Sequence, residues 1–131
     1  MSAGLVILIL KIAVAAVTVL WLASLVALAA GKTKLHGRIN IAFFALTLAA
    51  LIGLELIARV IVPEIFDDYV REHGDALRIH LAFSLPSAGL LFVMLFTGLK
   101  HKRTFHIAAG ILFGVLWAGT FYTGIFMLPH E

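Results

Sequence analysis

The sequence predicts an all-α integral membrane protein, a four-helix bundle with both termini on the outer side of the membrane. Three observations support this prediction. Hydrophobic residues make up 63% of the 131 residues and charged residues only 13%, with a mean hydropathy of +1.11. The apolar residues form four runs of about 20 residues or more, the length that crosses a roughly 30 Å hydrocarbon core as a helix. The basic residues gather in short loops between these runs.

The four runs place helices at about residues 4–30, 39–62, 79–99 and 105–128, in one transmembrane domain spanning residues 1–131. The first run contains Lys11, and the second contains Glu55 and Arg59. Since residues four apart are neighbours on a helix, Glu55 and Arg59 are expected to form an ion pair. Ala27-Leu28-Ala29 resembles a signal-peptidase site, but no basic segment precedes the run, which favours a retained helix.

The loops predict the orientation. Two of them are basic, with Lys32, Lys34 and Arg38 after the first run and Lys100, Lys102 and Arg103 after the third. The segment between the second and third runs is acidic, and a short interfacial helix is possible over Ile65–Glu72. The positive-inside rule places the basic loops in the cytoplasm, so we expect a protein of the bacterial cytoplasmic membrane surrounded by lipid. Basic residues split among short loops do not indicate a nucleic-acid partner. The four runs show no evident repeat.

Small and polar residues share one face of each expected helix at 100° per residue, and such faces usually form helix–helix interfaces in membranes. Along the chain these faces comprise Lys11, Ala15 and Thr18; His36, Asn40 and Thr47; His80, Ser84, Ser87 and Met94; and His106, Gly110, Phe113, Trp117, Thr120 and Gly124. They predict a bundle whose interior contains three histidines.

His36 and His106 begin the second and fourth helices at similar depth on the cytoplasmic side. Two neutral imidazoles facing each other between helices can ligate a b-type haem, with Arg38 among the basic residues at the level of the propionates. Trp117 is then either part of the core or a wall beside the cofactor. The alternative is that both histidines cap helix starts beside lipid headgroups, and the spacing alone favours this alternative.

His80, Glu55 and Lys11 lie toward the outer side. The favoured interpretation is a structural Glu55–Arg59 pair with His80 hydrogen-bonded beside it. The other is a quinone, proton or metal site, which makes Glu55 and His80 candidate metal ligands alongside His36 and His106. Copper, or no cofactor, is then the alternative to haem. The chain has no cysteine, which excludes thiolate ligands, and no nucleophile–base set, phosphate loop or HExxH helix indicates an enzyme.

One ordered set of residues resembles a known family: Lys34-Leu35-His36, Arg78-Ile79-His80, His106, Trp117 and Thr123-Gly124. Their order and spacing are similar to those of the four-helix membrane family named domain of unknown function 420, over roughly residues 32–128. The resemblance implies that His36, His80 and His106 are the functional histidines, and that the protein serves maturation of a respiratory haem–copper cytochrome oxidase. The sequence departs from the family pattern at Gly37-Arg38, directly after His36, and at Glu55 in the second run.

Three functions therefore remain open. The first is a haem- or metal-binding assembly factor for a respiratory oxidase, which the resemblance favours. The second is a b-type cytochrome that exchanges electrons with a quinone. The third is a structural membrane subunit in which polar residues only join helices.

Overall fold

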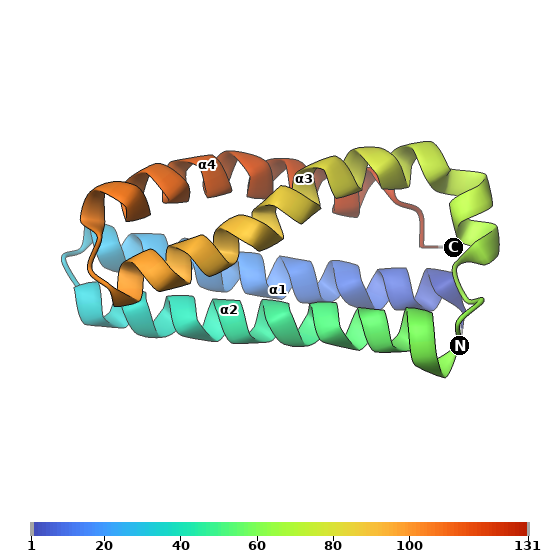
Figure 1. The fold of residues 1–131 in the computed structure, drawn as a ribbon, viewed down its shortest axis with the longest axis horizontal. Helices are drawn as coiled ribbons and strands as arrows, with labels where there is room; N and C mark the ends of the chain where they lie inside the picture. Colours follow the sequence, from blue (N-terminus) through green and yellow to red (C-terminus); the bar gives the residue numbers. More distant parts are fainter. Residues whose placement is uncertain (1, 131) are drawn as a thin grey trace. The chain divides into compact units, whose positions relative to one another are not determined.

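The computed structural model describes residues 2–130, and its regular elements there are all helices (Figure 1). In chain order they are α1 (Ala3–Ala29), α2 (Thr33–Leu56), α3 (Asp67–Leu99) and α4 (Arg103–Tyr122), with π-helical turns at Ile57–Ile61 and Thr123–Met127 continuing α2 and α4. Four helical segments are long and apolar enough to cross a membrane. The predicted all-α class is confirmed, as is the presence of four helices long and apolar enough to cross a membrane.

Two helices begin earlier than the hydropathy predicts. α2 begins at Thr33, within a basic segment that was expected to be loop. α3 begins at Asp67, within the segment where a separate short helix was expected. A helix continues past the hydrocarbon boundary as long as its backbone stays hydrogen-bonded, whereas hydropathy registers only the apolar part. The backbone of α3 departs from helical dihedral angles at His73, with φ −124° and ψ 25°. The short helix expected over Ile65–Glu72 thus corresponds to the first turns of α3.

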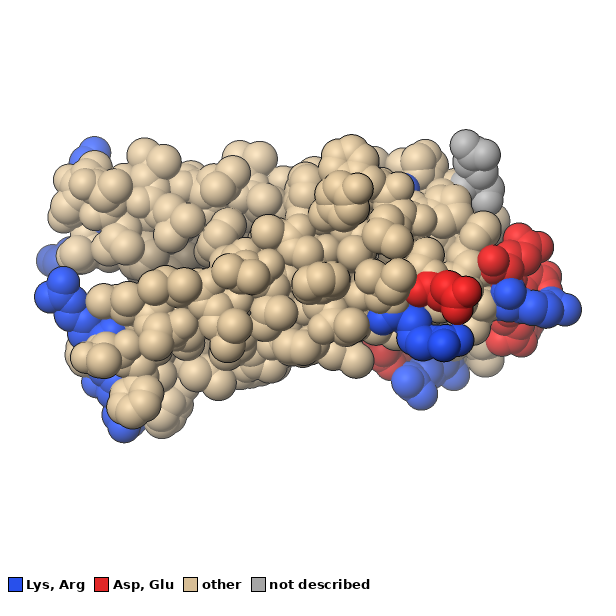
Figure 2. All heavy atoms as spheres, turned by 90° about the horizontal axis from the view of Figure 1, so that it is seen from above, with Lys and Arg blue, Asp and Glu red and all other residues tan. Residues whose placement is uncertain are grey.

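The chain divides into two compact units, one within Met1–Gly74 and Leu128–Glu131 and the other over Asp75–Met127. We call α1 and α2 the first hairpin, and α4 with the part of α3 from Asp75 onward the second hairpin. In the first hairpin, Val17, Ser24 and Ala27 of α1 are buried, as are Phe43 and Thr47 of α2. Large apolar side chains on the other faces are exposed, as expected for lipid contact. In Figure 2 the charged side chains gather toward helix ends, and the surface between them is uncharged.

The second hairpin is joined by close packing between α3 and α4. Phe113 is fully buried, and the Trp117 ring stacks on it with centroids 5.5 Å apart. The Thr120 hydroxyl lies 3.2 Å from that of Ser87 on the facing helix. Gly119 faces Phe83 so closely that a Cβ at this glycine would lie 2.2 Å from the ring. A glycine at this point therefore leaves room for the Phe83 ring to pack against the α4 backbone.

The turns that close the two hairpins are alike. Each contains a residue with left-handed backbone, Gly31 with φ 78° and His101 with φ 56°. The same three backbone hydrogen bonds tie each turn to the preceding helix, joining residues 26 to 30, 28 to 31 and 27 to 32 in one and 96 to 100, 98 to 101 and 97 to 102 in the other. The hairpins thus form a structural repeat, which the sequence pattern did not predict, and His36 and His106 occupy corresponding positions in it.

The Phe83–Gly119 approach gives a testable pair of substitutions. Gly119→Ala should lower the free energy of unfolding by about 1–3 kcal/mol, because the new methyl group overlaps the Phe83 ring. Gly89→Ala on α3 is the matched control, since no atom lies within 4 Å of its Cβ position and alanine favours helix over glycine. Thermal melting in one detergent compares them. Equal melting temperatures for the two variants would contradict the close approach.

Candidate functional site

His36 lies in the first turn of α2 and is held by α1. Its Nδ1 lies 2.9 Å from the Ser24 carbonyl oxygen and 2.7 Å from the Ser24 hydroxyl. That hydroxyl donates to Oδ1 of Asn40 at 2.5 Å, and Nδ2 of Asn40 lies 3.1 Å from Nε2 of His36. Ser24, Asn40 and His36 therefore form a closed hydrogen-bonded ring at the turn end of the first hairpin.

The Ser24 carbonyl determines the tautomer of His36. A carbonyl oxygen only accepts, so the Nδ1 atom beside it has to carry the proton. In a neutral imidazole the other nitrogen, Nε2, then presents a lone pair. Nδ2 of Asn40 is the donor that meets this lone pair in the ring.

His106 is held in the same way at the corresponding position of the second hairpin. Its Nδ1 lies 3.0 Å from the Met94 carbonyl oxygen and 3.1 Å from the Thr97 hydroxyl. The Thr97 hydroxyl donates its proton to the Val93 carbonyl at 2.8 Å. Its oxygen therefore accepts a hydrogen bond from Nδ1–H of His106. A Cβ at Gly98 would lie 3.2 Å from the imidazole, which shows that the ring packs against the α3 backbone.

His80 has a matching environment at the other end of the second hairpin. Its Nδ1 lies 2.8 Å from the Thr123 hydroxyl, which itself donates to the Gly119 carbonyl at 2.7 Å. The ring packs against Gly124, whose Cβ would lie 3.1 Å from it. Thr123 also begins the π-helical turn that continues α4, and such turns are frequent at functional sites.

All three inward histidines therefore have the Nδ1–H tautomer. Metal-bound histidines commonly donate one ring N–H to a backbone carbonyl and bind the metal through the other nitrogen. The same hydrogen bonds also join two helices, as polar side chains do in membrane bundles. The geometry is thus compatible with ligation through Nε2 and with a purely structural role.

The other predicted site residues are distributed as follows. His36 and Glu55 belong to the first hairpin, and His80 and His106 belong to opposite ends of the second. Within residues 2–130, no three side chains of His, Asp or Glu come together as a metal-binding group. Trp117 is buried against Phe113 of its own helix, so it forms part of the second hairpin's core.

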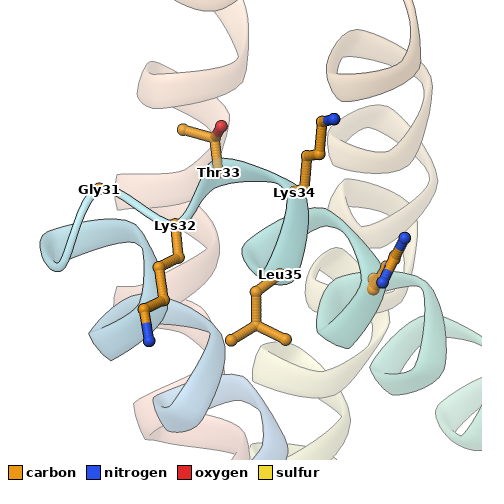
Figure 3. A pocket seen from close by; sticks show the side chains of 6 residues that line it. Gly31, Lys32, Thr33, Lys34 and Leu35 are labelled. Atoms are coloured by element: carbon orange, nitrogen blue, oxygen red, sulfur yellow. The ribbon is translucent and has the colours of Figure 1, made fainter.

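Arg38 lines a hollow of about 450 Å³ at the turn of the first hairpin, together with Gly31, Lys32, Thr33, Lys34 and Leu35 (Figure 3). The Lys32 and Lys34 side chains leave the turn in different directions (Figure 3). Among the described residues neither they nor Arg38 form a salt bridge. This turn therefore presents positive charge that is not neutralised within the hairpin.

The predicted ion pair between Glu55 of α2 and Arg59 of the π-helical turn that follows is present, and both side chains are exposed. Lys11 does not join it, because its Nζ lies 2.9 Å from Nδ1 of His130 in the C-terminal segment. That segment is also held by Tyr69, whose hydroxyl donates to the Pro129 carbonyl at 2.8 Å. The outer charged residues of the first hairpin thus form two separate contacts.

The inward faces of α2, α3 and α4 agree with the predicted ones, but that of α1 does not. Ala15 is exposed, whereas Ser24, which was not predicted, is fully buried against His36. Thr97 was likewise missed. The available signal was a hydroxyl-bearing residue near the end of the preceding helix, 12 residues before His36 and 9 residues before His106.

Comparison of the chain with protein-family models, with curated proteins and with solved structures finds no match.

Replacing one residue of the Glu55–Arg59 pair should destabilise the protein more than replacing both. Glu55→Gln or Arg59→Gln leaves one unpaired charge on a membrane-spanning helix and should lower the melting temperature in detergent. Replacing both residues by leucine removes both charges and should restore stability close to that of the unaltered protein. If a single variant melted at the same temperature as the unaltered protein, the ion pair would contribute nothing to stability.

Proposed function

We propose that this chain is a small membrane protein that binds haem, or alternatively a metal ion such as copper, and assists the assembly of a respiratory haem–copper oxidase. The cofactor would be a b-type haem with His36 and His106 as axial ligands. The observation that supports this most is that both imidazoles, at corresponding positions of a repeat, have Nδ1–H bound to a backbone carbonyl. With the proton on Nδ1, Nε2 is the nitrogen through which either histidine would bind a metal.

The residues around these histidines suit a haem in part. The unpaired positive charges of Lys32, Lys34 and Arg38 are of the sign that attracts haem propionates. Gly98 allows the His106 ring to pack closely against the α3 backbone. The Asn40 amide, however, has to turn away before an iron can bind His36. The role in oxidase assembly rests on the resemblance of the histidine motifs alone.

A structural role is the second candidate, and a specific observation favours it. Each inward histidine links two helices through Nδ1, which satisfies a polar group that lipid cannot. In this case the chain is a non-catalytic membrane subunit, and no cofactor binds.

A b-type cytochrome that reacts with a quinone is distinguished from an assembly factor by reduction of the haem with a quinol.

The orientation that accompanies this proposal has both termini outside and both basic turns in the cytoplasm, because positively charged loops are retained there. Reporter proteins fused after Lys34 and after Lys102 should both report a cytoplasmic location. A periplasmic signal from either fusion would reverse the assigned topology.

Haem binding is tested by titrating the purified protein in mild detergent and recording the Soret and visible bands. The unaltered protein should give a low-spin spectrum, and His36→Ala or His106→Ala should abolish it or convert it to high spin. His80→Ala should leave it unchanged, as should the control His101→Asn in the exposed turn. No haem in any variant favours the structural role, and loss of metal or haem in His80→Ala would place the site at the other end.

A further inference from the structure

The two corresponding histidines differ at one neighbouring position. Asn40 follows His36 by one helical turn and contacts its Nε2, whereas Gly110 stands at the corresponding place after His106. A Cβ at Gly110 would meet only the end of Met94, at 3.6 Å. The amide at position 40 is therefore a feature of the first hairpin alone and not a requirement of the shared turn.

We infer that Asn40 gates His36: its side-chain amide covers the Nε2 lone pair, and a metal centre or other electrophile binds only after the amide turns away. This inference rests on the proposed function for the identity of the ligand, a haem iron or transition-metal ion. The covering of Nε2 itself follows from the hydrogen-bonded ring of the first hairpin.

The direction of each hydrogen bond in the ring supports the gate. The Ser24 carbonyl requires the proton on Nδ1 of His36, and the Ser24 hydroxyl proton goes to Oδ1 of Asn40. The Asn40 amide is thereby oriented with its NH₂ group toward Nε2, 3.1 Å away. Ser24 thus positions Asn40 as well as His36, because its hydroxyl bonds to both.

The gate lowers the affinity of His36 for an incoming ligand. An incoming ligand at His36 has to replace one amide–imidazole hydrogen bond. The loss of one such bond corresponds to roughly a three- to tenfold change in an equilibrium constant. Asn40 is therefore a positioning residue that does not itself ligate the metal.

The gate is tested by the rate at which diethyl pyrocarbonate modifies individual histidines, measured by peptide mass spectrometry on the full chain in detergent. Asn40→Ala should raise the modification rate of His36 about three- to tenfold. The rate of His106 in the same sample is the internal reference and should not change. Thr47→Val, which alters another buried polar side chain of α2, is the matched control and should leave His36 unchanged.

Ser24→Ala provides a second variant should Asn40→Ala fail to fold. It keeps the Ser24 carbonyl, and hence the tautomer, but removes the hydroxyl that orients Asn40. It should raise the His36 rate by a smaller factor. Equal His36 rates in the unaltered protein and in a folded variant that lacks the amide or its anchor would overturn the inference.

Haem titration of the same variants separates this inference from the proposed function. Asn40→Ala should tighten haem binding by the same three- to tenfold factor. Faster His36 modification with no Soret band in any variant supports the gate and rejects haem binding. A His36-dependent haem spectrum with modification rate and affinity both unaffected by Asn40→Ala supports haem binding and rejects the gate.

Discussion

A polar side chain on a membrane-spanning helix has to be hydrogen-bonded within the protein, because lipid offers no partner. The histidines meet this requirement through Nδ1, which bonds to a hydroxyl or carbonyl group on the adjacent helix of the same hairpin. One kind of bond therefore sets three properties at once. It fixes which face of the helix turns inward, joins the two helices near an end of the hairpin, and selects the tautomer whose Nε2 can coordinate a metal.

The helices were predictable because hydropathy measures the property that lipid requires of a spanning segment. Their starts were not. Lys34 and Arg38 lie within α2, where charge suggested a loop, and the segment from Asp67 belongs to α3 rather than to a separate short helix. The backbone can complete its hydrogen bonds in the polar interface whatever the side chains are. The repeat of the two hairpins was also missed, because it resides in backbone geometry and in the burial pattern while few residues are identical.

Prediction of the inward face succeeded where polar residues alternate with apolar ones at helical spacing, as from His106 in α4 to Gly124 in the π-helical turn that continues it. It failed on α1, because that helix is almost uniformly apolar and its inward face has no periodic signal. Lys11 was the most visible landmark, yet it contacts His130 at the hairpin's open end. Ser24, a small and unremarked residue, instead holds His36. A partner of this kind is recognisable only once the turn geometry is known.

The second hairpin bears on whether its histidines serve only to join helices. Ser87 and Thr120 already bring hydroxyl groups together between α3 and α4, and small hydroxyl side chains are the usual means of joining membrane helices. Thr97 follows His80 at the same spacing as Thr123 follows His106, and the histidine of each helix meets a Thr-Gly pair that follows the histidine of the other. An imidazole is bulkier than a hydroxyl group and more polar, and joining alone does not require it. Its additional property is the second nitrogen, and this is the physical reason to expect that these positions bind a ligand.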